Sequence, residues 1–206
     1  MKRTKPAERP FVESFAEKAG ILKRTKDKVP RMYYLCGAIT NDPHAELKFS
    51  LAEIYLKGSG NQVINPMRIS PIGTPWHEAL SADLEILVSM KKVYMELLKL
   101  SNKLDVSKIY YPTIALIDPM TRKIDSRGMT LEVAFASDIL PVVQLSTRWD
   151  DVLFQALKEK EEDDRTCFNC AHITRTRETN LPYCSERGVC PHYSGNVCDK
   201  YERAKE

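Results

Sequence analysis

The chain has 206 residues, of which 43% are hydrophobic and 29% are charged, and its net charge is +3. A chain of this length can bury one core and carry a small appendage, and its net charge favours no particular class of partner. The sequence has no run of about 18 apolar residues, and the first ten residues, MKRTKPAERP, contain no apolar signal core. We therefore expect a cytoplasmic protein that is neither secreted nor inserted into a membrane.

Residues 1–30 are rich in Lys and Arg and contain three prolines. One short helical pattern runs from Phe11 to Ala19. This composition predicts a basic, flexible N-terminal arm. A solvated tail is the simpler interpretation, and contact with nucleic acid is the alternative.

Strands and helices alternate from Met32 onward. The apolar run MYYLCGAIT predicts a buried strand, and the polar NDPH after it predicts a helix cap. The next segment, AELKFSLAEIYLKGSG, repeats apolar residues at spacings of three and four, which predicts an amphipathic helix that stops at Gly58 and Gly60. A short strand, QVINP, is expected to follow.

The same alternation continues in the second half of the domain. Residues from Trp76 to about Leu104 keep helical spacing without Gly or Pro, which fits one long helix or two abutting helices. We then expect a strand (TIALIDP), a helix (RGMTLEVAFASD), a strand (ILPVVQL) and a final helix (RWDDVLFQALKEK). The pattern predicts an α/β domain over residues 31–160, with a flavodoxin-like or Rossmann-like parallel sheet and helices on both faces.

In such a sheet, ligands bind beyond the carboxyl ends of the strands. The loops expected there are Gly37–Asp42, Asn65–Arg68 and Asp118–Gly128. The last loop leads into a helix whose first N–H groups favour an anion. Glu132 lies about one turn inside that helix, and a carboxylate so close to an anion site must serve a purpose other than binding phosphate.

The segments YYLCGAIT, VINP, W…D and SRGMTLE, in this order, resemble the nucleoside 2-deoxyribosyltransferase-like superfamily. That superfamily includes nucleotide N-hydrolases and small phage and bacterial proteins of unassigned activity. The resemblance covers about Met32 to Leu145, and it implies that Glu132 is the catalytic nucleophile and that Asp83 and Tyr34 are further catalytic residues. The substrate-binding positions that it implies are Gly37, Ile39, Thr40, Asn65, Trp76, Ser126, Arg127 and Gly128.

Cleavage of a glycosidic bond passes through an oxocarbenium-like state, which a carboxylate below the anomeric carbon can stabilise or trap covalently. Asp83 lies at the edge of the apolar stripe of its helix, where it can orient the sugar or move a proton to the departing base. From the pattern alone, both acids also fit ordinary helix-surface positions. His77 fits a cap or surface residue better than an acid–base catalyst, and Trp76 fits a base-stacking residue or a core anchor equally well.

Position 126 discriminates between activities within the superfamily. Transferases that act on free nucleosides tend to have aspartate six residues before the nucleophile, whereas nucleotide hydrolases tend to have serine, as this chain does at Ser126. A hydroxyl can donate to a 5′-phosphate, whereas a carboxylate repels it. The chain departs from the hydrolases at Thr40, where they often have arginine, and in a helical insertion at about 91–111. Arg127 or Arg68 would then compensate the phosphate charge.

Five of the six cysteines lie between residues 167 and 198. A CxxC pair followed by further cysteines is the pattern of a structural zinc site, so we predict a small C-terminal zinc-binding module over residues 165–206 and no cofactor for catalysis. An iron–sulfur cluster and disulfides are the alternatives, and Cys36 is predicted to be a buried core thiol. Similar C-terminal modules end in Cys-x-x-Tyr/Phe, which favours as ligands Cys167, Cys170, Cys184 and Cys198, with Cys190 and His192 as competitors.

These features favour an enzyme that cleaves the N-glycosidic bond of a 2′-deoxynucleotide, as a hydrolase or a deoxyribosyltransferase. One alternative is a binding module, in which the α/β domain senses a nucleotide while the basic arm or the zinc module contacts nucleic acid or protein. Another is an NAD-type glycohydrolase that uses the same glutamate. The sequence leaves open the base, the acceptor and the oligomeric state, a homo-oligomer included.

Overall fold

The computed structural model describes residues 8–22, 27, 29–39, 42–71, 73–100, 105, 109–118, 126–164, 173–175, 182–184 and 188–189. The chain divides into two compact units, Met1–Leu153 and Phe154–Glu206. None of the helices in these ranges combines the length and the apolar character that crossing a bilayer requires.

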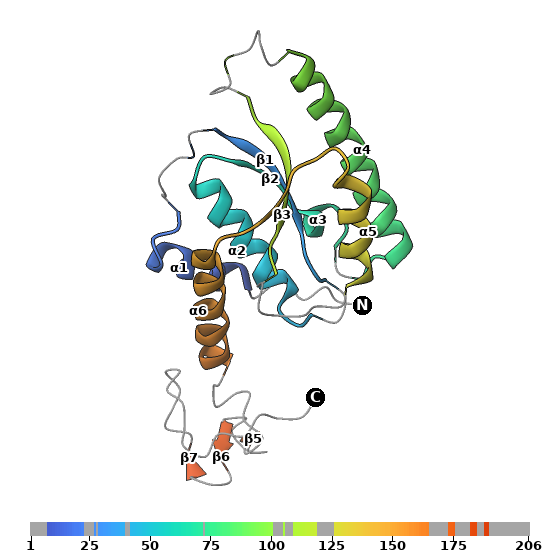
Figure 1. Cartoon of the computed structure of the whole chain (residues 1–206). Helices are drawn as coiled ribbons and strands as arrows, with labels where there is room; N and C mark the ends of the chain where they lie inside the picture. Colours follow the sequence, from blue (N-terminus) through green and yellow to red (C-terminus); the bar gives the residue numbers. More distant parts are fainter. Residues whose placement is uncertain are drawn as a thin grey trace. The chain divides into compact units, whose positions relative to one another are not determined.

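The first unit is built on a parallel sheet (Figure 1). Its strands are β1 (Arg31–Cys36), β2 (Gln62–Ile64), β3 (Tyr111–Leu116) and β4 (Val142–Gln144), in the order β2-β1-β3-β4. All three pairings are parallel. The central strands β1 and β3 are buried at positions 33–36 and 112–115, mostly with apolar side chains, as expected for a parallel sheet that is covered on both faces. The predicted α/β architecture is therefore confirmed, and the strand order is that of the first four strands of a flavodoxin-like sheet.

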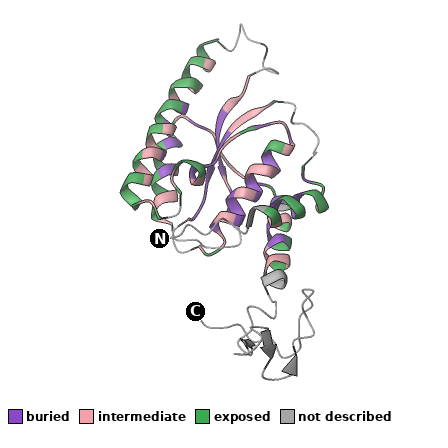
Figure 2. Ribbon diagram, turned by 180° about the vertical axis from the view of Figure 1, so that it is seen from behind, coloured by how far each residue is buried: buried purple, intermediate pink, exposed green. Residues whose placement is uncertain are grey.

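Helices cover both faces of this sheet (Figure 1). One face holds α2 (Ala45–Gly58) and the first turns of α6 (Thr147–Asp164), where the rings of Tyr55 and Trp149 lie 5.4 Å apart. The other face holds α4 (Trp76–Leu100) and α5 (Arg127–Ala136), and the short α3 (Pro66–Ile69) precedes α4. Residues 76–100 thus form one continuous helix, the first of the two predicted options. Figure 2 shows that the helices are buried along the sides that face the sheet.

The N-terminal segment differs from the predicted flexible arm. Helix α1 (Glu8–Lys18) packs on α2 and buries Val12, Phe15 and Ala16, and Ile21 is buried just after it. The approach to α2 is close, because a Cβ at Gly58 would lie 2.2 Å from the carbonyl oxygen of Ile21. Residues 8–22 therefore belong to the folded unit. Their high charge concealed a short apolar stripe that α2 covers.

The described part of the second unit contains a small antiparallel sheet. Its strands are β5 (Ile173–Arg175), β6 (Pro182–Cys184) and β7 (Gly188–Val189), in the order β5-β6-β7. Of the predicted metal ligands, only Cys184 lies on one of these strands. Cys167, Cys170, Cys190, His192 and Cys198 lie outside the described residues, so the zinc site stays a prediction.

Candidate active site

A cavity of about 870 Å³ opens at the carboxyl edge of the sheet and is lined by the segments that follow β1, β2 and β3. The chain leaves β1 toward β2 on one side and leaves β3 toward β4 on the other, so the cavity lies where the direction of the connections reverses, which is the usual ligand position in open α/β sheets. The cavity is lined by most of the predicted site residues, namely Gly37, Ile39, Trp76, Asp83, Ser126, Arg127, Gly128 and Glu132. Thr40 lies outside the described residues.

Two buried carboxyl groups line this cavity and interact electrostatically. Asp83 lies on the face of α4 that also buries Leu87 and Met90, at helical spacings of four and three, and it is 5% exposed. Glu132 lies on the face of α5 that also buries Ala136, and it is 9% exposed. Neither acid is therefore an ordinary helix-surface residue.

Burial gives both carboxyl groups unusually high proton affinity. The pKa of Glu132 is raised from 4.5 to about 7, mainly by burial and also by the charge of Asp83, and hydrogen bonds of Cys36 and Tyr34 partly offset this rise. Burial also raises the pKa of Asp83 from 3.8 to about 6, against a smaller opposite effect of Tyr34. Because the two groups interact, they titrate as a pair, which holds about one proton between pH 6 and 7.

Two side chains of β1 interact with this pair of carboxyl groups. Tyr34 and Cys36 are two residues apart, so their side chains point to the same side of the sheet. The Cys36 thiol donates to Oε2 of Glu132 at 3.3 Å. It is fully buried, as predicted, and burial together with the charge of Glu132 raises its pKa well above the ordinary value.

Tyr34 is also buried and does not line the cavity. Burial raises the pKa of its hydroxyl, and the charges of Glu132 and Asp83 raise it further, so Tyr34 keeps its proton. Its hydroxyl is close enough to lower the pKa of both carboxyl groups. Within the described part of the chain, however, neither this hydroxyl nor Oδ1 of Asp83 makes a hydrogen bond of standard geometry.

The start of α5 forms a second part of the cavity wall. The Ser126 hydroxyl oxygen accepts from the Met129 N–H at 3.3 Å and thus caps the helix, which leaves its hydroxyl proton available to a ligand. The first N–H groups of a helix have no partner within it, so this end favours an anion. The Arg127 guanidinium lies 5.4 Å from the centre of the Trp76 ring, and both residues line the cavity.

Three other residues that the sequence suggested for the site do not line the cavity. Asn65 instead caps α3, since its side chain accepts from the Met67 N–H at 3.1 Å and donates to Glu53 at 2.9 Å. Arg68 pairs with the same glutamate on the surface, and the His77 side chain is 79% exposed. Of the two arginines considered for the phosphate, the structure brings only Arg127 to the cavity.

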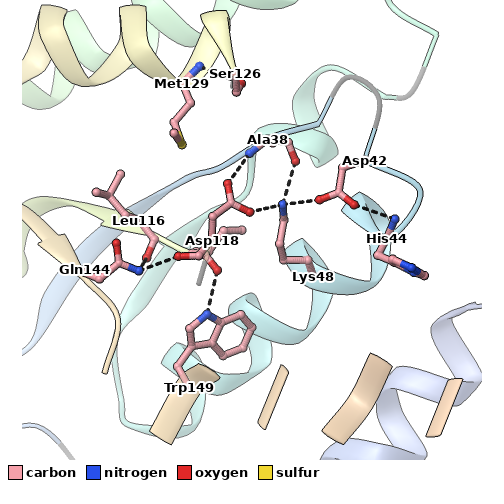
Figure 3. Close-up of polar contacts among 11 residues, drawn as sticks. Ala38, Asp42, His44, Lys48, Leu116, Asp118, Ser126, Met129, Gln144 and Trp149 are labelled. Carbon is pink, nitrogen blue, oxygen red and sulfur yellow. Dashed lines mark hydrogen bonds and ion pairs between the residues drawn. The ribbon is translucent and has the colours of Figure 1, made fainter. Parts of the chain in front are cut away.

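Sequence reasoning missed a buried polar network behind the β1 loop (Figure 3). Lys48 on α2 is 3% exposed and donates to the Ala38 carbonyl at 2.9 Å, to Asp42 at 2.6 Å and to Asp118. Asp118 also accepts from the Ala38 N–H at 2.7 Å. All three donors of the ammonium group are thus satisfied, and the loop that follows β1 is tied to the end of β3.

The same strand end is held from the other side. Gln144 of β4 donates to the Asp118 carbonyl at 2.7 Å, and Trp149 of α6 donates to the Ile117 carbonyl at 2.8 Å. One signal for the network was present in the sequence. Lys48 lies three residues after Ala45 and four before Ala52, on the stripe of α2 that faces the sheet.

Among the described residues, no three His, Cys, Asp or Glu side chains come together as a metal site. The cavity wall offers carboxyl groups, hydroxyls and one arginine, and the Cys36 thiol contacts one of these carboxyl groups, that of Glu132. This arrangement can stabilise a positive charge and transfer a proton.

Residues 31–100 match a family described as a domain of unknown function, DUF4406. The match runs from β1 through α4, so it includes Tyr34, Gly37 and Asp83 and ends before Ser126 and Glu132. It covers less than half of the chain. No match was found among curated proteins or among solved structures.

Proposed function

We propose that the α/β unit cleaves the N-glycosidic bond of a 2′-deoxynucleotide, with Glu132 as the group that stabilises or covalently traps the sugar. The observation that carries this proposal is the pair of buried carboxyl groups, Glu132 and Asp83, whose raised pKa values of about 7 and about 6 coincide in one cavity. Such shifts concentrate at sites where groups must exchange protons near neutral pH.

A pair that holds one proton supplies both groups that the reaction needs. The ionised Glu132 attacks the anomeric carbon, the bond from that carbon to the base nitrogen breaks, and its electron pair stays on the base. Asp83 gives the departing base its proton. Water, or a second base, then attacks the anomeric carbon, the bond from that carbon to Glu132 breaks, and the proton of the attacking group passes to Asp83.

The distribution of the proton changes along this path. In the free protein, Glu132 has the higher pKa and holds the proton more often than Asp83 does. A positive charge that develops on the sugar favours the ionised form of the nearest carboxyl group. With Glu132 under the anomeric carbon, the proton therefore shifts to Asp83 as the glycosidic bond weakens.

The start of α5 supports a nucleotide rather than a free nucleoside as substrate. The Ser126 hydroxyl can donate to a 5′-phosphate, the helix N-terminus favours negative charge, and Arg127 provides a cation on the same wall. Trp76 offers an aromatic face to the base. Glu132 then lies one to two turns from the phosphate site along the same helix.

For residues 165–206 we propose a structural zinc site, with Cys167, Cys170, Cys184 and Cys198 as ligands. The proposal depends on the spacing of these cysteines in the sequence. It assigns no catalytic role to the metal.

The direct test is to incubate the protein with each common deoxynucleoside 5′-monophosphate and the matching nucleoside, and to quantify the free base by chromatography. We expect release from at least one monophosphate. We expect Asp83→Asn to slow it by at least about a hundredfold, as for the loss of a general acid. Glu85→Gln, which changes an exposed acid of the same helix, should leave the rate unchanged. Saturable binding of nucleotides without any base release would contradict the proposed enzyme and would favour a nucleotide sensor.

A further inference from the structure

In the described part of the chain, the Cys36 side chain makes a hydrogen bond to the carboxyl group of Glu132. Its Sγ lies 3.3 Å from Oε2 of Glu132 and 3.9 Å from the carbonyl oxygen of Met129. A thiol has one hydrogen to donate, and the shorter contact to a charged acceptor is the stronger one. The thiol therefore donates to Glu132 when that group is ionised.

The backbone around Cys36 holds the thiol in place. Cys36 is the last residue of β1, paired with Leu116 of β3, and its carbonyl accepts from the Ile117 N–H at 3.0 Å. The next residue, Gly37, lies so close to β3 that an added Cβ would come within 2.8 Å of Cγ1 of Ile117. The strand end cannot shift without disturbing the central pair of strands.

We propose that Cys36 is a positioning residue for the cleavage proposed above: its thiol holds Oε2 of Glu132 against β1, directs Oε1 toward the cavity and favours the ionised carboxylate. When Glu132 is protonated, the thiol turns to the Met129 carbonyl, which is its other acceptor. The contact thus strengthens as the carboxylate becomes negative, at the stage when that charge is needed.

Other groups around Glu132 act differently. Asp83 on α4 opposes ionisation of Glu132, and Tyr34 on β1 favours it through its hydroxyl. Asp118 at the end of β3 acts on Cys36, where it helps to raise the pKa of the thiol. The thiol therefore stays protonated across the neutral range and remains a donor while Glu132 titrates.

The test is a titration of the Glu132 side-chain carboxyl by carbon-13 NMR in the full-length protein, with the signal assigned by its loss in Glu132→Gln. Two variants change the donor at nearly constant size. Cys36→Ser supplies a stronger donor and Cys36→Ala supplies none. A hydrogen bond of ordinary strength corresponds to about half a pKa unit or more, so we expect the pKa of Glu132 to be lowest in Cys36→Ser, intermediate in the wild type and highest in Cys36→Ala.

Any other order of the three pKa values, or three equal values, would overturn the proposal. A role of Cys36 in packing alone predicts no such order, and thermal unfolding of each variant shows whether the fold is kept. The titration needs no substrate, so its outcome is separate from that of the activity. Base release without the expected order removes only the role of Cys36. The expected order without base release by the wild type removes the proposed function instead.

Discussion

Replacing Glu132 by glutamine should stabilise the protein at alkaline pH. The pKa of Glu132 is raised in the folded protein by burial and by the charge of Asp83, whereas in the unfolded chain it has its usual value. Between pH 4.5 and about 7, Glu132 ionises more readily in the unfolded chain than in the folded protein. The folded protein therefore loses stability as the pH rises through this range. Glutamine has the same shape and no charge, so Glu132→Gln removes this loss.

The size of the effect follows from the two pKa values. Between 4.5 in the unfolded chain and about 7 in the folded protein, each pKa unit corresponds to about 1.36 kcal/mol, or about 3 kcal/mol in total. The stabilisation by Glu132→Gln should be about 1 kcal/mol at pH 5 and should reach about 3 kcal/mol at pH 8. In a chain of this length, about 3 kcal/mol raises the unfolding temperature by roughly 6–12 °C.

Urea unfolding of the wild type and of Glu132→Gln at pH 5 and pH 8 measures this difference. Glu85→Gln on α4 is the matched control, because that acid is exposed and should give no difference that depends on pH. If the difference in unfolding free energy between Glu132→Gln and the wild type is the same at pH 5 and pH 8, the raised pKa of Glu132 is refuted. It would also remove the main physical argument for the site.

Three further predictions address other parts of the chain. Ser126→Asp keeps the helix cap, because aspartate caps as well as serine, but it should cost at least about tenfold in kcat/KM on a deoxynucleotide relative to the nucleoside; equal losses on both would exclude phosphate recognition at this residue. Lys48→Met removes the ammonium group that compensates the buried charges of Asp42 and Asp118, and it should lower the free energy of unfolding by roughly 3–5 kcal/mol, whereas Lys57→Met, at an exposed pair of the same helix, should lower it by less than about 1 kcal/mol; similar losses would show that the buried network contributes little. Metal analysis should find about one zinc per chain, and its removal should unfold residues 165–206 but not the α/β unit; less than about half a zinc, with no iron, would contradict the module.

The sheet and most helices could be predicted because local periodicity carries them. Each strand of the first unit coincides with a short apolar run, and α2, α4 and α5 follow apolar spacings of three and four. The pattern also indicated the helix at α1, but its packing on α2 was missed, because a basic composition outweighed the stripe formed by Val12, Phe15 and Ala16. These apolar side chains are buried only because α1 packs on α2, and this tertiary contact is not visible in the local sequence.

The candidate site was only partly accessible from the sequence. The resemblance indicated Glu132 and Asp83, but helical periodicity alone could not show whether either acid was buried. Their raised pKa values depend on burial between segments that are distant along the chain and, for Glu132, on the charge of Asp83 on another helix. Lys48 was overlooked because lysine on an amphipathic helix usually points to solvent, and its partner Asp118 lies 70 residues away.

The central claim is that Glu132 carries the cleavage of the glycosidic bond. Its most direct test is the rate of base release by Glu132→Gln at pH 7, with saturating deoxynucleotide and with folding verified by the unfolding curves. We predict a loss of at least about a thousandfold relative to the wild type, in a variant that is more stable than the wild type, while Glu85→Gln keeps the full rate. A folded Glu132→Gln variant that releases base at a rate near that of the wild type would contradict the claim.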